Sequence, residues 1–162
     1  MAYEESELVY AGFWPRLGAY LLDAVLLYLI IYALLFMMYG LGYFEDPNAY
    51  WGPMQPLISY GVAPALILLF WINKSRTPGK MAIAATIVDA QTGAKPSTKQ
   101  FLIRYLGYLL STLPLFLGFL WVVFDSRKQS WHDKLAGTVV VQRKAGTSDP
   151  VRFEEPLSQT TA

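Results

Sequence analysis

The chain of 162 residues contains no cysteine, one histidine and few charged residues. The absence of cysteine excludes a disulfide framework, a thiolate metal site and a cysteine nucleophile. A single histidine makes a poor metal site, so we expect neither a metal nor another cofactor. Charged residues make up 15% of the chain, whereas an ordinary soluble domain carries roughly 25%. Because 54% of the residues are hydrophobic, this deficit indicates an integral membrane protein of one domain.

The chain also lacks the motifs of the common enzyme classes, and we do not expect an enzyme. No nucleophile, histidine and acid are spaced as a triad, and no nucleotide motif occurs. The segment Thr77-Pro78-Gly79-Lys80 lacks the upstream glycine and the following Ser or Thr of a phosphate loop. We interpret it as the capped start of a short helix. The aromatic residues interleaved with the basic ones suit a membrane belt, so nucleic-acid binding is not expected.

Three apolar segments are long enough to cross a bilayer. They cover about residues 16–39, 54–73 and 99–124. The loop 40–56 contains no Lys or Arg, whereas Lys74 and Arg76 follow the second segment. By the positive-inside rule, the N-terminus and the basic loop 73–99 face the cytoplasm. The sequence therefore predicts a multi-pass protein of the cytoplasmic membrane, with the lipid bilayer as its first partner.

Two short β-prone runs, residues 86–89 and 138–142, lie outside the apolar segments. Neither satisfies its backbone alone, so we expect them to pair as a small cytoplasmic two-stranded element. Both runs then lie on one side of the membrane, and residues 99–124 must enter and return as a re-entrant hairpin bent at Leu113-Pro114. We favour this hairpin over a single span, which would place five basic residues of the segment 125–144 outside.

The predicted fold is therefore an all-α integral membrane protein with two long transmembrane helices, a third apolar segment and a small β element. Residues 1–10 are interpreted as a polar, acidic lead. Residues 11–144 form the membrane domain. Residues 145–162 are polar, contain two prolines and are predicted to be a disordered tail.

The first apolar segment carries two charges, Arg16 near its start and Asp23 further in. An aspartate near the centre of a spanning helix costs about 2.5–3.5 kcal/mol on insertion scales. A spacing of seven residues puts both side chains on one helix face, but about 10 Å apart along the axis. We therefore expect Asp23 to find its partner in residues 99–134. Two interpretations remain open: Asp23 exchanges a proton or cation, or it forms an ion pair that fixes the helix, either with Arg16 or with a basic residue of the segment His132-Asp133-Lys134.

Four segments carry a family resemblance in matching order and spacing across most of residues 11–141. They are AGFWPRLGAYLLD, RTPGKMAIAATIVDAQTGAKPS, RYLGYLL and FDSRKQSWHDKLAGTVVV. With them the chain resembles the RDD family of small bacterial membrane proteins. The resemblance implies a location in the cytoplasmic membrane and a role in transport, cation/proton antiport being proposed for some members.

The family is named after one arginine and two aspartates. Arg16 and Asp23 match the first two of these residues. The second aspartate maps best to Asp133, with Asp125 as the competing candidate. The chain departs from the pattern at Pro15, where relatives more often have another residue, and this does not disturb the motif.

The remaining candidates surround Asp133, for which sequence alone leaves Arg16, Arg104 and Lys80 as partners. His132 could relay a proton with Asp133, but we favour a hydrogen-bonding residue that orients the last strand. Five basic residues are candidates for contact with lipid headgroups. They are Lys74, Arg76, Lys80, Arg127 and Lys128.

Two functions follow from this arrangement. The first is a small transporter or cation/proton exchanger that uses Asp23 with Arg16, its ligand being a proton or a monovalent cation. Two or three passes are few for a pathway, so this hypothesis predicts a homo-oligomer. The alternative is a non-transporting membrane scaffold or accessory subunit that binds a partner protein or lipid.

Overall fold

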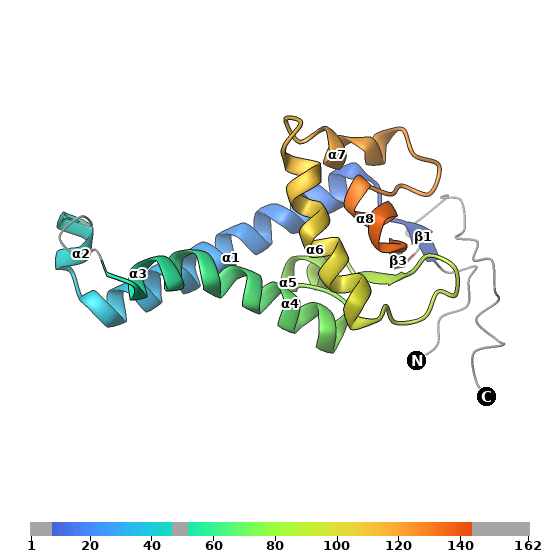
Figure 1. Cartoon of the computed structure of the whole chain (residues 1–162). Coiled ribbons are helices and arrows are strands. Elements are labelled where there is room, and N and C mark those ends of the chain that lie inside the picture. The colour runs from blue at the N-terminus through green and yellow to red at the C-terminus, as the bar shows by residue number, and fades with distance from the viewer. Residues whose placement is uncertain (1–7, 47–51, 144–162) are drawn as a thin grey trace.

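The computed structural model describes residues 8–46 and 52–143, which form a two-helix arm and a compact cap (Figure 1). Helix α1 (Phe13–Tyr39) runs through both parts. Its 27 residues rise about 40 Å, and Pro15 lies in its first turn, where a missing N–H is harmless. Gly40 ends the helix with a positive φ of 70° and donates its N–H to the carbonyl of Phe36.

The second helix of the arm is continuous but irregular. It comprises α3 (Met54–Pro56), a π-helical turn η3 (Leu57–Gly61) and α4 (Val62–Lys74). The π turn ends three residues before Pro64, whose missing N–H disrupts a regular α-helical ladder. Both α1 and Met54–Lys74 are long and apolar enough to cross a membrane. The two predicted long apolar helices are therefore present, each as a candidate membrane span.

The far end of the arm is closed by the short helix α2 (Gly42–Glu45). Tyr43 of this helix packs in a small core with Leu35 of α1 and Ile58 of the second helix. Along the rest of the arm, α1 presents large apolar side chains outward, such as Val25 and Leu29, which are 59% and 58% exposed. This exposed surface suits a helix surrounded by hydrocarbon.

The described residues of the cap contain one antiparallel sheet of three strands in the order β1-β3-β2. The strands are β1 (Leu8–Tyr10), β2 (Ala85–Asp89) and β3 (Thr138–Arg143). Ile87 lies opposite Val140, which confirms the predicted pairing of the two β-prone runs. On the other edge of β3, Val9 lies opposite Gln142. The sheet core joins Ile87 and Val140 to the buried rings of Trp71 and Phe101.

The prediction of only two strands is wrong, because residues 8–10 belong to the sheet rather than to a polar lead. Their three-residue apolar run is too short to signal a strand by alternation. It becomes ordered because β3 offers a second free edge. The rest of the predicted lead and the predicted disordered tail lie outside the described residues.

The third apolar segment folds back on itself. Helix α6 (Thr98–Thr112) begins at a capping box formed by Ser97 and Gln100. A turn containing Leu115 and Phe116, both with positive φ, leads to α7 (Leu117–Leu120) and the 3₁₀ turn η4 (Trp121–Val123). The chain bends by 112° between α6 and this second part. This bend and the pairing of β2 with β3 agree with the predicted hairpin.

Two short helices complete the cap and carry its polar residues. Helix α5 (Pro78–Ala82) follows Thr77, as the sequence predicts, and packs against α1. Helix α8 (Trp131–Ala136) lies between Ser130 and the left-handed Gly137 and packs against α6. Helix α5 therefore brings polar side chains to α1, and α8 brings them to the fold-back segment.

Candidate functional site

Asp133 lies at the centre of the cap and is completely buried. It occupies the third position of α8, and the backbone N–H of Ser130 donates to its Oδ2 atom at 3.1 Å. The local sequence explains this position, because a serine followed three residues later by an acid forms a capping box. The helix start therefore orients the carboxylate through a local contact that does not involve the distant residues.

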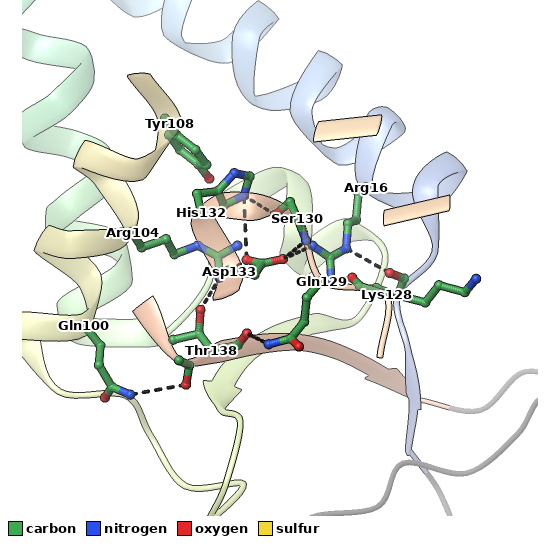
Figure 2. A network of polar contacts seen from close by, with 12 residues as sticks. Arg16, Gln100, Arg104, Tyr108, Lys128, Gln129, Ser130, His132, Asp133 and Thr138 are labelled. Carbon is green, nitrogen blue, oxygen red and sulfur yellow. Dashed lines mark hydrogen bonds and ion pairs between the residues drawn. The ribbon is translucent and has the colours of Figure 1, made fainter. Parts of the chain in front are cut away.

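Two arginines from different helices hold the Asp133 carboxylate, as Figure 2 shows. Arg16 Nη1 of α1 lies 2.5 Å from Oδ2, and Arg104 Nη1 of α6 lies 2.5 Å from Oδ1. Burial raises the pKa of Asp133, but the Coulomb attraction of Arg104 and Arg16 outweighs it and sets the pKa far below the ordinary value. The carboxylate therefore stays ionised at neutral pH.

The arginines also donate to groups beyond Asp133. Arg16 Nε donates to the Ala11 carbonyl at 2.8 Å, and its Nη2 donates to the Lys128 carbonyl at 2.7 Å. Arg104 Nη1 donates to Thr138 Oγ1 at 2.8 Å (Figure 2). One ion cluster thus joins α1, α6, α8 and β3. Breaking such a buried cluster by removing one partner typically costs about 3–5 kcal/mol.

His132 is buried beside this cluster and hydrogen-bonded on both ring nitrogens. Ser111 Oγ lies 3.1 Å from Nδ1, and Ser130 Oγ lies 2.7 Å from Nε2. Burial lowers the pKa of His132 well below its ordinary value, against the attraction of Asp133. A neutral ring between two hydroxyl groups favours the predicted structural role over a proton relay. Gly107 permits this packing, because a Cβ there would lie 2.9 Å from His132 Cβ.

Asp23 finds its partners where the sequence did not indicate them. Its Oδ2 accepts a hydrogen bond from Thr77 Oγ1 at 2.5 Å, and its Oδ1 accepts one from the Gly79 N–H at 2.6 Å. Both donors belong to the start of α5, whereas we expected a partner in residues 99–134 or Arg16. That expectation is wrong, since Arg16 is occupied by Asp133. The half-buried Asp23 side chain instead completes the cap of a short helix.

The contact between α1 and α5 depends on the absence of a side chain at Gly79. A Cβ on Gly79 would lie 2.1 Å from the Ala19 carbonyl oxygen and 2.9 Å from Asp23 Cγ. The Thr-Pro-Gly sequence contained a signal for this site, because an N-cap threonine and an N-terminal N–H are natural donors to a carboxylate. What the sequence did not reveal is which carboxylate they bind.

Lys80, a candidate for lipid contact, is buried and only 1% exposed. Its ammonium lies 4.5 Å from the centroid of the Tyr20 ring on α1. Burial lowers the pKa of Lys80, and the arginines add to this effect, while Tyr20 and Asp23 oppose it. The expected headgroup contact is therefore wrong for this lysine, since its side chain turns into the protein.

The other predicted residues lie around the periphery of the cluster. Asp125 pairs with Lys134 and accepts from the Gln129 N–H at 2.9 Å, so it is not the aspartate held by Arg16. Burial alone would raise the pKa of Asp125, but the combined effect of these partners is larger and brings the pKa below its ordinary value. Arg127 donates to the Ala90 carbonyl.

Three more basic candidates remain at or near the surface. Lys74 is exposed, and Arg76 and Lys128 are half-buried. The Lys128 ammonium donates to the carbonyl of Val123 at 3.2 Å. No group of three or more His, Cys, Asp or Glu side chains that could hold a metal ion occurs within residues 8–46 and 52–143.

Comparison with known proteins places this arrangement in context. The family model described as "RDD family" matches residues 10–137. The uncharacterized protein RP437 of Rickettsia prowazekii is 41% identical over 75 residues, which cover 46% of this chain and 41% of that protein. The uncharacterized protein YxaI of Bacillus subtilis is 26% identical over 149 residues, which cover 82% of this chain and 97% of that protein. No solved structure matches significantly.

Proposed function

The chain belongs to the RDD family, and we propose that it is a membrane-embedded accessory subunit that does not itself transport ions. The observation that carries this proposal is that protein donors occupy both conspicuous acids, Asp23 and Asp133. In this proposal the arm lies in the cytoplasmic membrane and the cap lies on its cytoplasmic face, as the basic residues of the loop 73–99 favour.

Asp133 is poorly suited to carry a proton or cation. It is fully buried between two guanidinium groups and its pKa is strongly lowered, so protonation near neutral pH is unfavourable. A cation would have to displace Arg16 or Arg104 from the carboxylate. This environment supports a structural role in which Asp133 holds the fold-back segment against the membrane helix.

Asp23 is more accessible, but both of its oxygens already accept hydrogen bonds from Thr77 and Gly79. The cavity beside it has a volume of only about 40 Å³ and is lined mainly by apolar side chains of the two arm helices. Two helices alone do not enclose a pathway through a membrane. These features support a role for Asp23 in docking α5 onto α1.

The exposed apolar surface of the arm supplies the accessory part of the proposal. Large side chains such as Val25, Leu29 and Met37 point away from the described protein core. Such a surface suits contact with lipid or with helices of a partner membrane protein. In this proposal the cap is a polar module at one end of the arm, held together by the ion cluster.

A flux measurement tests this proposal. The purified chain is reconstituted into vesicles with an imposed proton or sodium gradient, beside vesicles with a known exchanger and vesicles without protein. We expect the wild type and Asp23→Asn to match the vesicles without protein. Flux in the wild type that disappears in Asp23→Asn would overturn the proposal.

The second candidate function is cation/proton exchange centred on Asp23. One observation favours it: a half-buried carboxylate lies in a helix long and apolar enough to cross a membrane, and the buried Lys80 ammonium interacts with it electrostatically. This function requires further copies of the chain to enclose a pathway. Mass determination in native membrane fragments tests that requirement, and a strictly monomeric protein would exclude this form of exchange.

A further inference from the structure

A pocket with a volume of about 410 Å³ opens where α1 leaves the cap. Its walls come from the first two turns of α1, the returning half of the fold-back segment and the start of α8. The apolar residues that line it are Phe13, Leu17, Phe116, Phe119, Leu120 and Val122. A volume of this size lies in the range of small-molecule binding sites, about 300–1,000 Å³.

The pocket wall is almost entirely apolar, and buried polar residues lie behind one end of it. These residues are Arg16, Ser130 and His132. Arg16 belongs to the ion cluster described above, and Ser130 and His132 lie beside that cluster. That cluster carries two guanidinium groups for one carboxylate, since Arg16 and Arg104 share Asp133 and His132 is neutral. An excess positive charge behind an apolar pocket favours the binding of an amphipathic anion. The low dielectric of the surroundings screens the field of this charge less than water would.

The surroundings of the pocket indicate that it faces the membrane rather than water. The turn of the fold-back segment exposes Leu113, Leu115 and Phe116 by 78%, 86% and 59%. Trp14 on α1 and Trp121 on the returning half are also exposed, by 76% and 43%. Leucines of this exposure suit hydrocarbon, and tryptophans suit the interface between hydrocarbon and headgroups.

A second basic group lies next to the pocket. The Lys128 carbonyl accepts from Arg16, and its ammonium reaches the carbonyl of Val123, the neighbour of the lining residue Val122. Lys128 therefore adds a half-exposed positive charge near the pocket. A phosphate group beside it would meet both this ammonium and the positive potential of the cluster.

We propose that this pocket binds one acyl chain of an anionic phospholipid of the surrounding bilayer, with the phosphate directed towards Lys128 and the Arg16 end. The inference does not depend on whether the chain transports ions. It assigns a ligand to a space between three segments that the ion cluster holds together. The bound lipid would bridge the membrane helix and the fold-back segment at the bilayer surface.

The test is native mass spectrometry of the purified full chain in detergent, titrated with phosphatidylglycerol or with phosphatidylcholine of the same chain length. Leu120→Trp and Leu17→Trp fill the pocket from opposite walls. Leu113→Trp makes the same exchange on the exposed turn outside it. We expect each pocket variant to bind phosphatidylglycerol about tenfold more weakly, the equivalent of two methylenes left unburied. We expect Leu113→Trp to bind like the wild type.

Charge is tested separately with Lys128→Asn, in which asparagine tolerates the positive φ of 52° at this position. Lys99→Asn removes an equal charge from an exposed site in the first turn of α6. We expect Lys128→Asn to reduce the preference for phosphatidylglycerol about fivefold, and Lys99→Asn to leave it unchanged.

Three results would overturn the proposal. The first is that the wild type retains no lipid. The second is that all three tryptophan variants bind phosphatidylglycerol equally, because the lipid would then lie on the outer surface and not in the pocket. Equal binding of phosphatidylcholine and phosphatidylglycerol by the wild type would contradict the anionic ligand. Circular dichroism of each variant confirms that weakened binding does not reflect unfolding, and the two pocket variants, on different elements, give independent results.

Discussion

The two aspartates of this chain occupy contrasting environments although both lie near the membrane helix. Asp133 is fully buried and ion-paired with two arginines from α1 and α6. Asp23 is half-buried and accepts hydrogen bonds from one hydroxyl and one backbone N–H. The difference shows that the chain uses one acid to join distant segments and the other to dock a neighbouring short helix.

This contrast predicts that Asp133→Asn is the most damaging of the conservative substitutions. It leaves two buried guanidinium groups with one neutral partner, and we expect a loss of about 3–5 kcal/mol in the free energy of unfolding. Thermal unfolding in detergent, followed by circular dichroism, measures it. Lys134→Gln is the control, because it breaks the half-exposed pair with Asp125, worth about 0–1 kcal/mol. Equal losses in the two variants would refute the contrast.

The docking of α5 on α1 is tested by Gly79→Ala. The added Cβ would collide with the Ala19 carbonyl, so we expect a destabilisation of about 1–3 kcal/mol. Gly18→Ala on the neighbouring turn of α1 is the control, since a Cβ there has no atom within 4 Å. Because alanine favours a helix more than glycine does, the control should be neutral or slightly stabilising. If both variants unfold at the same temperature, the close contact is not important for stability.

The pH dependence of the free energy of unfolding tests the buried surroundings of His132, the neighbour of Asp133. The pKa of His132 is lowered well below the ordinary value by burial, so the unfolded chain binds a proton below about pH 6.5 that the folded chain does not. The stability is therefore lost as the pH falls, by about 1.4 kcal/mol per unit between the unfolded and folded pKa values. We expect His132→Gln to lack this slope between pH 6.5 and 5. An identical slope in both proteins would show that His132 is not buried in its neutral form.

The smallest effect is expected from Thr77→Val, which removes one of the two donors to Asp23 and keeps the shape of the side chain. We expect a loss of about 1–2 kcal/mol in the free energy of unfolding. Asp23→Asn should abolish most of the effect of Thr77→Val in a double variant, because both changes remove the same contact. Strictly additive losses would indicate that Thr77 stabilises the fold by another route.

Most of the secondary structure could be predicted from the sequence, but few of the contacts between charged residues in the site could. The two long helices, the sheet pair of residues 85–89 and 138–143, the start of α5 after Thr77 and the fold-back segment follow from apolar length, short β-prone runs and the Thr-Pro pair. These signals are local or depend on a single topological constraint. They could therefore be recognised without a structure.

The sequence offered Arg16, Arg104 and Lys80 as partners of Asp133 but could not choose among them, and the structure pairs it with the two arginines. The partners of Asp23 were missed, because all these contacts depend on how distant segments meet. Arg16 and Asp133 are 117 residues apart, and Asp23 and Thr77 are 54 apart. Helix periodicity placed Arg16 and Asp23 on one face, which suggested that they act together. Tertiary packing instead turns Arg16 towards α8, and Asp23 caps α5. Strand β1 was missed for a similar reason, since it is ordered only by the edge of β3.

The central claim is that Arg16 acts with Asp133 and not with Asp23. A pair of double-mutant cycles in unfolding free energy tests it most directly, using Arg16→Gln, Asp133→Asn and Asp23→Asn. We predict a coupling of about 2–3 kcal/mol between Arg16 and Asp133, and additivity within about 0.5 kcal/mol for Arg16 and Asp23. A large coupling of Arg16 to Asp23 with none to Asp133 would contradict the account.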